Sequence, residues 1–224
     1  MGALHVRWRN LFAVSNQFYS GYKVHDVSMG TKQTEDKQSD ALLLSKIAGN
    51  DREAFTLLAS RYEKAFFAIA YRMGLSVADS EEAVQESFIR IWRKASSWKP
   101  HKNTLPKSWL YKITSNVCLD FLRKARRQVE YYTQNYEETM QVQASNEKEA
   151  DRIIEEKQRQ ILIRSCVCAL PERQRMALIL CHYQELSNAE AAYSLGIGIK
   201  ALESLLVRAR KNLKSKLQSH EGIL

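Results

Sequence analysis

The sequence predicts an all-α protein with two small helical domains joined by a flexible acidic linker. Only 8 Gly and 3 Pro occur among 224 residues, and the stretches between them are rich in residues that enter helices at little entropic cost. Apolar residues recur at steps of three and four, which is the helical period. Two basic blocks, 99–127 and 200–216, hold eight and six Lys or Arg with one acid each, whereas 128–156 hold eight acids. The charge pattern therefore indicates two cationic domains separated by an acidic connector.

The overall charge and the apolar runs restrict the class of protein. A net charge of +9 indicates an anionic partner, and a nucleic acid or an acidic membrane surface would both satisfy it. The longest apolar runs reach about a third of the roughly 20 residues that cross a bilayer, and no secretory signal is evident. The four cysteines show no framework spacing, which is typical of a reducing compartment. We therefore expect a cytoplasmic protein without membrane insertion.

Residues 1–38 show no sustained helical period and run into a polar, charged tract at 31–40. Such a tract buries too little apolar surface to offset the entropy of ordering, so the segment is predicted to be a disordered leader. Met29 begins a stretch that continues directly into the first predicted helix. We therefore expect translation to start naturally at Met29.

The first domain, 39–127, is predicted to hold four helices. The first runs from Asp40 to the break at 49–51, and the second ends near Met73 and Gly74. Asp79 and Glu82 have capping-box spacing, which predicts the start of the third helix. After a loop at 96–106, the fourth helix is expected from about residue 107 to 127. The third and fourth helices are expected to turn these residues inward: Val84, Phe88, Ile91, Trp92, Ala95, Leu110, Ile113, Val117 and Phe121.

The second domain, 153–219, follows a linker at 128–152 and is predicted to contain a helix-turn-helix. Pro171 is expected to start a helix whose Met176, Leu178, Ile179 and Leu180 supply core. Ser187 and Glu190 have capping-box spacing, and Gly196 is placed where a helix must stop sharply. A second helix then runs from about residue 199 to 217. This layout is typical of proteins that place the second helix in the major groove of DNA.

The second helix of this motif is expected to present a polar front and a cationic end to DNA. Leu202, Leu206, Ala209 and Leu213 are predicted to face the core. Glu203 is expected to accept a hydrogen bond from a cytosine amino group. A solvated helix face is the alternative interpretation, but the cap, the glycine turn and the cations together favour DNA binding. The predicted DNA-binding residues of this helix are Lys200, Glu203, Ser204, Val207, Arg208, Arg210 and Lys211.

Three separate motifs occur in one order along the chain. They are DSEEAVQESFIRIW at 79–92, WLYKI at 109–113 with Asn116, Asp120, Leu122 and Arg123 behind it, and LPERQR at 170–175 before the helix-turn-helix. In order and spacing they resemble the extracytoplasmic-function (ECF) sigma factors, members of the sigma-70 family of bacterial RNA polymerase. The resemblance implies that the four-helix domain is sigma region 2 and the helix-turn-helix domain is sigma region 4.

The resemblance further implies a function without catalysis. Such a protein binds core RNA polymerase and directs promoter-specific transcription initiation, usually as a stress response held in check by an anti-sigma factor. The acidic linker is expected to occupy the polymerase cleft, or to be a solvated tether. The residues implied for polymerase binding are Glu82, Gln85, Glu86, Ile89, Arg90 and Arg93. Those implied for capture of promoter DNA by the fourth helix are Lys112, Ser115, Asn116, Arg123, Lys124, Arg126 and Arg127.

The sequence also departs from the resemblance and leaves alternatives open. Glu203 and Leu205 stand where these factors often carry basic residues, so the promoter sequence cannot be inferred. The row of aromatic residues that lets housekeeping sigma factors melt DNA broadly is absent, so we expect stringent promoter choice. A sigma-like decoy that binds a regulatory protein would be expected to lose its phosphate-binding cations, and a plain helix-turn-helix regulator leaves the first domain unexplained.

Enzyme and metal chemistry are not expected. Cys166 and Cys168 stand two residues apart on a helix and point to different sides, so they and the Cys181–His182 pair make a poor zinc site. No nucleophile elbow, phosphate-binding glycine loop or catalytic carboxylate pair occurs. We therefore expect no cofactor, no metal and no small-molecule substrate.

Overall fold

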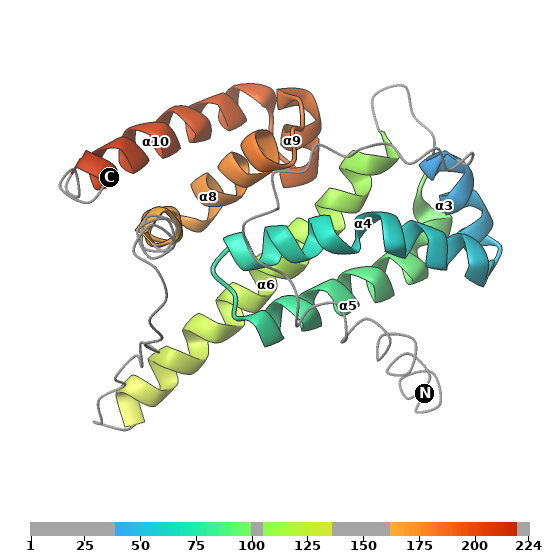
Figure 1. The fold of residues 1–224 in the computed structure, drawn as a ribbon, viewed down its shortest axis with the longest axis horizontal. Coiled ribbons are helices and arrows are strands. Elements are labelled where there is room, and N and C mark those ends of the chain that lie inside the picture. The colour runs from blue at the N-terminus through green and yellow to red at the C-terminus, as the bar shows by residue number, and fades with distance from the viewer. Residues whose placement is uncertain (1–38, 100–104, 136–161, 219–224) are drawn as a thin grey trace, which may run out of the picture. The chain divides into compact units, whose positions relative to one another are not determined.

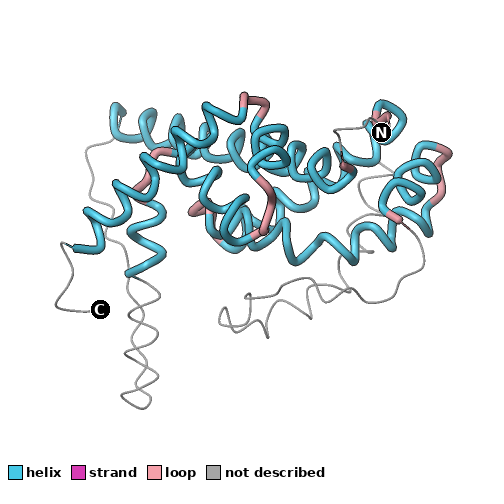
Figure 2. The backbone as a smooth tube through the Cα atoms, turned by 90° about the horizontal axis from the view of Figure 1, so that it is seen from above, coloured by secondary structure: helices cyan, strands magenta, loops and turns pink. Residues whose placement is uncertain are grey.

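The computed structural model describes residues 39–99, 105–135 and 162–218, all of which belong to one compact unit that spans 36–224. These residues form helices and short loops, without a strand among them (Figures 1 and 2). The predicted all-α class with two helical regions is therefore confirmed. The predicted leader, the loop at 100–104 and the linker from 136 onward lie outside the described residues. None of the helices described here combines the length and apolarity needed to cross a membrane.

The first two helices begin at side-chain caps and end close to the predicted positions. In α3 (Asp40–Ala48) the Ser39 hydroxyl accepts from the amide of Leu42 at 3.3 Å. In α4 (Arg52–Arg72) the Asp51 carboxylate accepts from the amide of Ala54 at 3.0 Å. Such caps satisfy amides that have no partner inside the helix. Gly74, at a φ of 91°, turns the chain away after α4, as predicted.

The start of the third helix differs from the prediction. Helix α5 runs from Val77 to Lys94 and is capped by Ser76, so the capping box predicted at Asp79 and Glu82 is wrong. The Ser76 hydroxyl accepts from the amide of Asp79 at 3.0 Å and donates to its carboxylate at 2.6 Å. Asp79 is therefore the hydrogen-bond partner of the cap residue Ser76, because a serine at a helix start and an acid three residues later can hydrogen-bond with each other.

The fourth helix is longer than predicted. After the short 3-10 turn η2 (Ala95–Ser97), helix α6 runs from Pro106 to Asn135, eight residues past the expected end at 127. Proline suits the first position because its missing N–H has no partner inside the helix. The prediction stopped where the apolar stripe fades, but residues 128–135 contain no Gly or Pro that would end a helix.

Aromatic side chains fill the core between α4, α5 and α6. The rings of Phe55 and Phe88 meet edge to face at 6.0 Å, as do those of Phe55 and Trp92 at 5.2 Å. Phe66, which lies on α4 like Phe55, also packs on Phe88, and the two ring centroids are 5.1 Å apart. The expected inward positions of α5 are thereby confirmed, and α4 and α5 lie side by side in Figure 1.

The C-terminal part carries the predicted helix-turn-helix. Residues 162–168 are helical and precede α8 (Glu172–Leu178), the π-helical turn η3 (Ile179–Tyr183), α9 (Asn188–Leu195) and α10 (Ile199–Gln218). Pro171 stands at the start of α8, as expected. Leu170, Leu178 and Ala209 form a buried cluster against which Leu213 packs. The π-helical turn was not predicted.

Candidate nucleic-acid interface

The helix-turn-helix is held by the cap and the turn that the sequence predicts. The Ser187 hydroxyl accepts from the amide of Glu190 at 3.3 Å, and the Glu190 carboxylate accepts from the amide of Ser187 at 2.8 Å. Gly196 follows α9 in the left-handed conformation, with φ 65° and ψ 35°. The capping box and the glycine stop are both confirmed, and together they fix where α10 begins.

Helix α10 buries one side and exposes the side predicted to meet DNA. Leu202, Leu206 and Ala209 are buried, and the predicted front and cationic end are exposed. Val207 lies on this front and is 63% exposed. An exposed apolar group on such a front can contact a thymine methyl in the major groove. Within the described part of the chain, no carboxylate pairs with Arg208, Arg210 or Lys211.

The predicted DNA-binding residues of helix α6 differ in their exposure: some are buried or partly buried, and the others are exposed to solvent. Lys112 is partly buried, with its ammonium 4.8 Å from the centre of the Tyr193 ring, and Ser115 is fully buried. The Ser115 hydroxyl has no hydrogen-bond partner among the described residues. Asn116 is exposed, and so are the four cations that end the described side chains of this helix: Arg123, Lys124, Arg126 and Arg127.

The residues predicted to bind polymerase share one stripe of α5. Glu82, Gln85 and Arg93 are exposed, whereas Glu86, Ile89 and Arg90 are partly exposed. The opposite side of the helix is buried through Val84, Phe88 and Ile91. This stripe is therefore open to a partner along its length.

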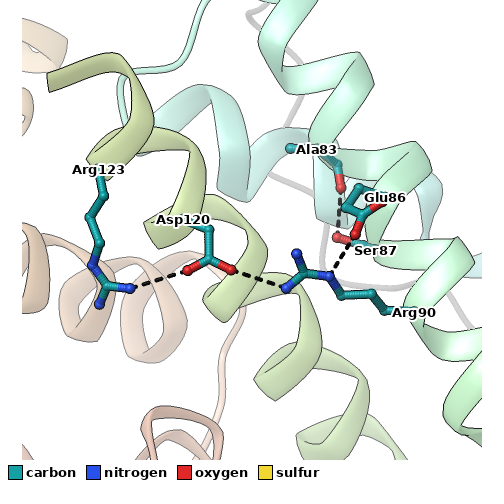
Figure 3. Close-up of polar contacts among 6 residues, drawn as sticks. All are labelled: Ala83, Glu86, Ser87, Arg90, Asp120 and Arg123. Atoms are coloured by element: carbon teal, nitrogen blue, oxygen red, sulfur yellow. Dashed lines mark hydrogen bonds and ion pairs between the residues drawn. The ribbon is translucent and has the colours of Figure 1, made fainter. Parts of the chain in front are cut away.

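An ion-pair chain links this stripe to the cationic end of α6 (Figure 3). Glu86 accepts from Arg90 at 2.7 Å, Arg90 donates to Asp120 at 3.1 Å, and Asp120 accepts from Arg123 at 3.1 Å. Burial lowers the pKa of the Arg90 guanidinium, but its bonds to Glu86 and Asp120 outweigh this effect, so the net shift is upward. Arg90 therefore stays charged, and Asp120 holds two arginines of different helices.

The bridging role of Asp120 was not predicted. The sequence offers one signal for it, since Asp120 is the single acid in the basic block 99–127. A lone carboxylate in such a block is well placed to organise the cations around it. The cysteines show no comparable arrangement: nowhere in the described ranges do three His, Cys, Asp or Glu side chains gather as metal ligands would.

Comparison with known proteins identifies the family. The model of sigma-70 region 2 matches residues 58–128, and that of sigma-70 region 4 matches residues 155–213. RNA polymerase sigma factor NccH of Alcaligenes xylosoxydans xylosoxydans is 30% identical over 192 residues, which span 83% of this chain and 98% of NccH. The chain belongs to the sigma-70 family. This sigma factor is of the ECF type, as the resemblance of its three motifs implies.

Other relatives agree with this assignment. ECF RNA polymerase sigma factor SigE of Mycolicibacterium smegmatis is 26% identical over 166 residues, covering 74% of this sigma factor but only 62% of SigE. The fold is shared with CnrH in its complex with the cytosolic domain of CnrY, at a TM-score of 0.59 and 23% identity, over 81% of this chain and 99% of CnrH. It is also shared with RpoE from Bartonella quintana, at a TM-score of 0.54 and 23% identity, over 75% and 96% of the two chains.

The two family matches divide the described cations of this sigma factor. The region 2 match includes α5 and most of α6, and the region 4 match includes α9 and most of α10. The exposed cations at the end of α6 and those of α10 therefore belong to different sigma regions.

Proposed function

We propose that this sigma factor docks on core RNA polymerase through the α5 stripe and holds promoter DNA through α6 and α10. It directs promoter-specific initiation in the cytoplasm, catalyses no reaction itself and needs no cofactor. The α6 cations are assigned to the promoter segment nearer the start site, and α10 to the upstream segment. In this arrangement α6 and α10 each supply cations that attract phosphate whatever the DNA sequence, and each supplies a polar surface that faces the bases.

One observation carries this proposal above the others. Helix α10 follows a capped helix and a left-handed glycine, buries its back, and leaves its front and its cations exposed. Cations that were paired within the fold would have little attraction left for phosphate, whereas unpaired exposed ones release counterions when they bind. Val207, 63% exposed in the middle of this front, offers an apolar contact for a thymine methyl.

We also propose that an anti-sigma factor controls this chain. RpoE shares its fold and was solved in complex with the anti-sigma factor NepR. CnrH, which also shares the fold, was solved with the cytosolic domain of CnrY. The exposed α5 stripe supports the proposal, because a protein that covered it would compete directly with polymerase.

Run-off transcription tests the proposal. Purified core polymerase, a pool of genomic fragments and the full chain should yield discrete transcripts that are absent without the chain. If no fragment yields a transcript that depends on the chain, the sigma function is contradicted and a decoy is favoured.

Neutralising the α10 cations should impair initiation without weakening the docking on polymerase. We expect R208A/R210A/K211A to reduce transcription about tenfold or more, and to lower the slope of log K against log salt by about 0.9 for each lost phosphate contact. The matched control K46A/R52A/K64A removes three exposed cations of α3 and α4 and should change neither quantity. Equal losses in both variants would show that only total charge matters.

A further inference from the structure

We infer that Glu203 and Val207 together make α10 selective for two nearby base pairs of the upstream promoter segment, one through a cytosine amino group and the other through a thymine methyl. The inference rests on the proposed function of α10 and deepens it, because it names the groups of the DNA that this helix distinguishes. It also gives Glu203 a second effect, which is the rejection of DNA that offers no hydrogen-bond donor at its position.

The two side chains lie on one exposed face of α10. Leu202, Leu206 and Ala209 are buried and fix the helix on its domain. Glu203 and Val207 are exposed and stand one helical turn apart, so they lie one above the other on the same face. At about 1.5 Å per residue, they are separated by about 6 Å along the helix axis. Bases of one strand follow each other at about 3.4 Å, so the two side chains reach base pairs that are one or two steps apart.

The Glu203 carboxylate is an acid without a counter-charge on a cationic helix. It is the single acid among residues 200–216, which hold six Lys or Arg. In the part of the chain that the structure describes, no cation forms an ion pair with it. A carboxylate accepts hydrogen bonds and donates none, so phosphates and the acceptor atoms of bases both repel it. This repulsion is offset only where a base presents a donor to the carboxylate.

The donors of the major groove decide which base Glu203 accepts. Cytosine presents its N4 amino group and adenine its N6 amino group, whereas guanine and thymine present acceptors. A carboxylate placed against an acceptor would lose its hydrogen bonds to water without replacement. Adenine also carries the N7 acceptor beside its amino group, and cytosine has no acceptor of its own in this groove. On the strand that Glu203 faces, cytosine is therefore the best partner.

Val207 selects the second base by apolar contact. When its exposed side chain meets the C5-methyl of thymine, both groups are removed from water. Against a polar base edge the same side chain would cover donors or acceptors without replacing their hydrogen bonds. The nearby Ser204 supplies no competing donor, since its hydroxyl donates to the Lys200 carbonyl at 3.0 Å. This face of α10 therefore recognises one donor and one methyl group.

Selection from random DNA tests the preference of the natural chain. The full chain, alone and with core polymerase, is incubated with duplexes that carry a random segment, and the bound duplexes are sequenced. We expect a C·G pair and a T·A pair to be enriched together, one or two steps apart. Bound duplexes without this combination would overturn the inference.

Removing the carboxylate separates base selection from overall charge. E203A should discriminate the C·G pair from other pairs about tenfold less well, because one good base contact is lost. Its affinity for unrelated DNA should rise severalfold, because the repulsion of phosphate is removed. E53A, which removes an exposed acid of α4, is the matched control and should change neither quantity. If E203A binds all DNA more tightly and keeps the full discrimination, Glu203 acts through charge alone and the inference is wrong.

A change in the DNA isolates the Val207 contact. Replacing the selected thymine by deoxyuridine removes only the methyl group, and the natural chain should then bind severalfold more weakly. V207A should bind the thymine and deoxyuridine duplexes equally and should keep its preference for the C·G pair. L42A, which truncates an exposed apolar side chain of α3, is the control and should still distinguish the two duplexes. A V207A chain that also distinguishes them would contradict the role of Val207.

Transcription separates this inference from the proposed function. If the natural chain directs initiation, and E203A and V207A initiate with other base pairs at the two positions, both stand. If the natural chain directs initiation but neither variant changes the accepted base pairs, the inference fails and the sigma function stands. If the natural chain binds DNA with the expected preference but supports no initiation with core polymerase, the inference stands and the sigma function fails.

Discussion

Asp120 shows how one residue can organise charges that are each proposed to serve a different partner. Its two oxygens are 3.1 Å from Arg90 of α5 and 3.1 Å from Arg123 of α6. The three side chains are between 32% and 56% exposed, so water screens their attraction. The pairs therefore add little stability each, and their main effect is to hold two arginines at a fixed separation.

Replacing Asp120 should cost a small, salt-dependent amount of stability. We expect D120N to lower the free energy of unfolding by about 0.5–1 kcal/mol at low salt, because exposed ion pairs contribute about that much. Urea unfolding at low and high salt measures the effect, which should shrink as salt screens the charges. E203Q, which neutralises an exposed acid on α10, is the control and should change little. A loss that does not depend on salt would show that Asp120 acts through packing instead.

At the scale of the elements, helix ends account for most of the agreement between sequence and structure. The capping box at Ser187 and the stops at Gly74 and Gly196 were predicted, and the caps at Ser39 and Asp51 were not; all are local devices, each satisfied within four residues. Local chemistry is readable from sequence because it needs no distant partner. The start of α5 was predicted wrongly because two residues offered the same signal. Ser76 has Asp79 three residues later, and Asp79 has Glu82 three residues later, so either could have been the cap.

The turn of the helix-turn-helix offers a clean test of backbone strain. In G196A the new Cβ meets nothing within 4 Å, so the cost comes only from the left-handed backbone. We expect a loss of about 1 kcal/mol in thermal or urea unfolding. Gly198 also has open space around it and no positive φ, so G198A should not destabilise the protein. Similar losses in both variants would mean that the left-handed turn is not the cause.

At the scale of the whole molecule, contacts between distant parts of the sequence decide which surfaces are available. Arg175 and Met73 are 102 residues apart, and Ser194 and Ser108 are 86 apart, yet each pair is joined by a buried hydrogen bond. The Ser194–Ser108 bond holds α9 against α6, where the Tyr193 ring lies 4.8 Å from the Lys112 ammonium. The pattern of cations alone had grouped Lys112 with the exposed arginines of the same helix.

Arg175 should contribute more to stability than its exposed neighbours. We expect R175A to lower the free energy of unfolding by about 2 kcal/mol, because a buried hydrogen bond from a charged group is lost and the Met73 carbonyl is left without it. R173A, two residues away and exposed, should change the same quantity by less than about 0.5 kcal/mol. Urea unfolding followed by circular dichroism compares them. Equal effects would indicate that the Arg175 contact is not formed in solution.

Much of the candidate site could be predicted, and the remainder could not for a definite reason. The front and cations of α10 and the stripe of α5 are exposed as their periodicity indicates, since one helix face must be buried. Ser115 is fully buried, and the Lys112 ammonium lies over the Tyr193 ring of α9, a contact that no periodicity within α6 could indicate. The contacts of Gln184 with Tyr111 and of Tyr193 with Lys112 were not predicted, because they too join residues far apart in the sequence.

The sequence by itself determined the helical class, the glycine stops after α4 and α9, the capping box of α9, the buried stripe of α10 and the three motifs that mark the sigma-70 family. Each of these depends on residues a few positions apart, where spacing along the chain equals position on a helix. Only the tertiary structure decided that Asp120 bridges two helices, that Arg175 reaches the end of α4, and that α9 covers part of α6. Those features join residues far apart in the chain, and their geometry exists only once the helices have packed.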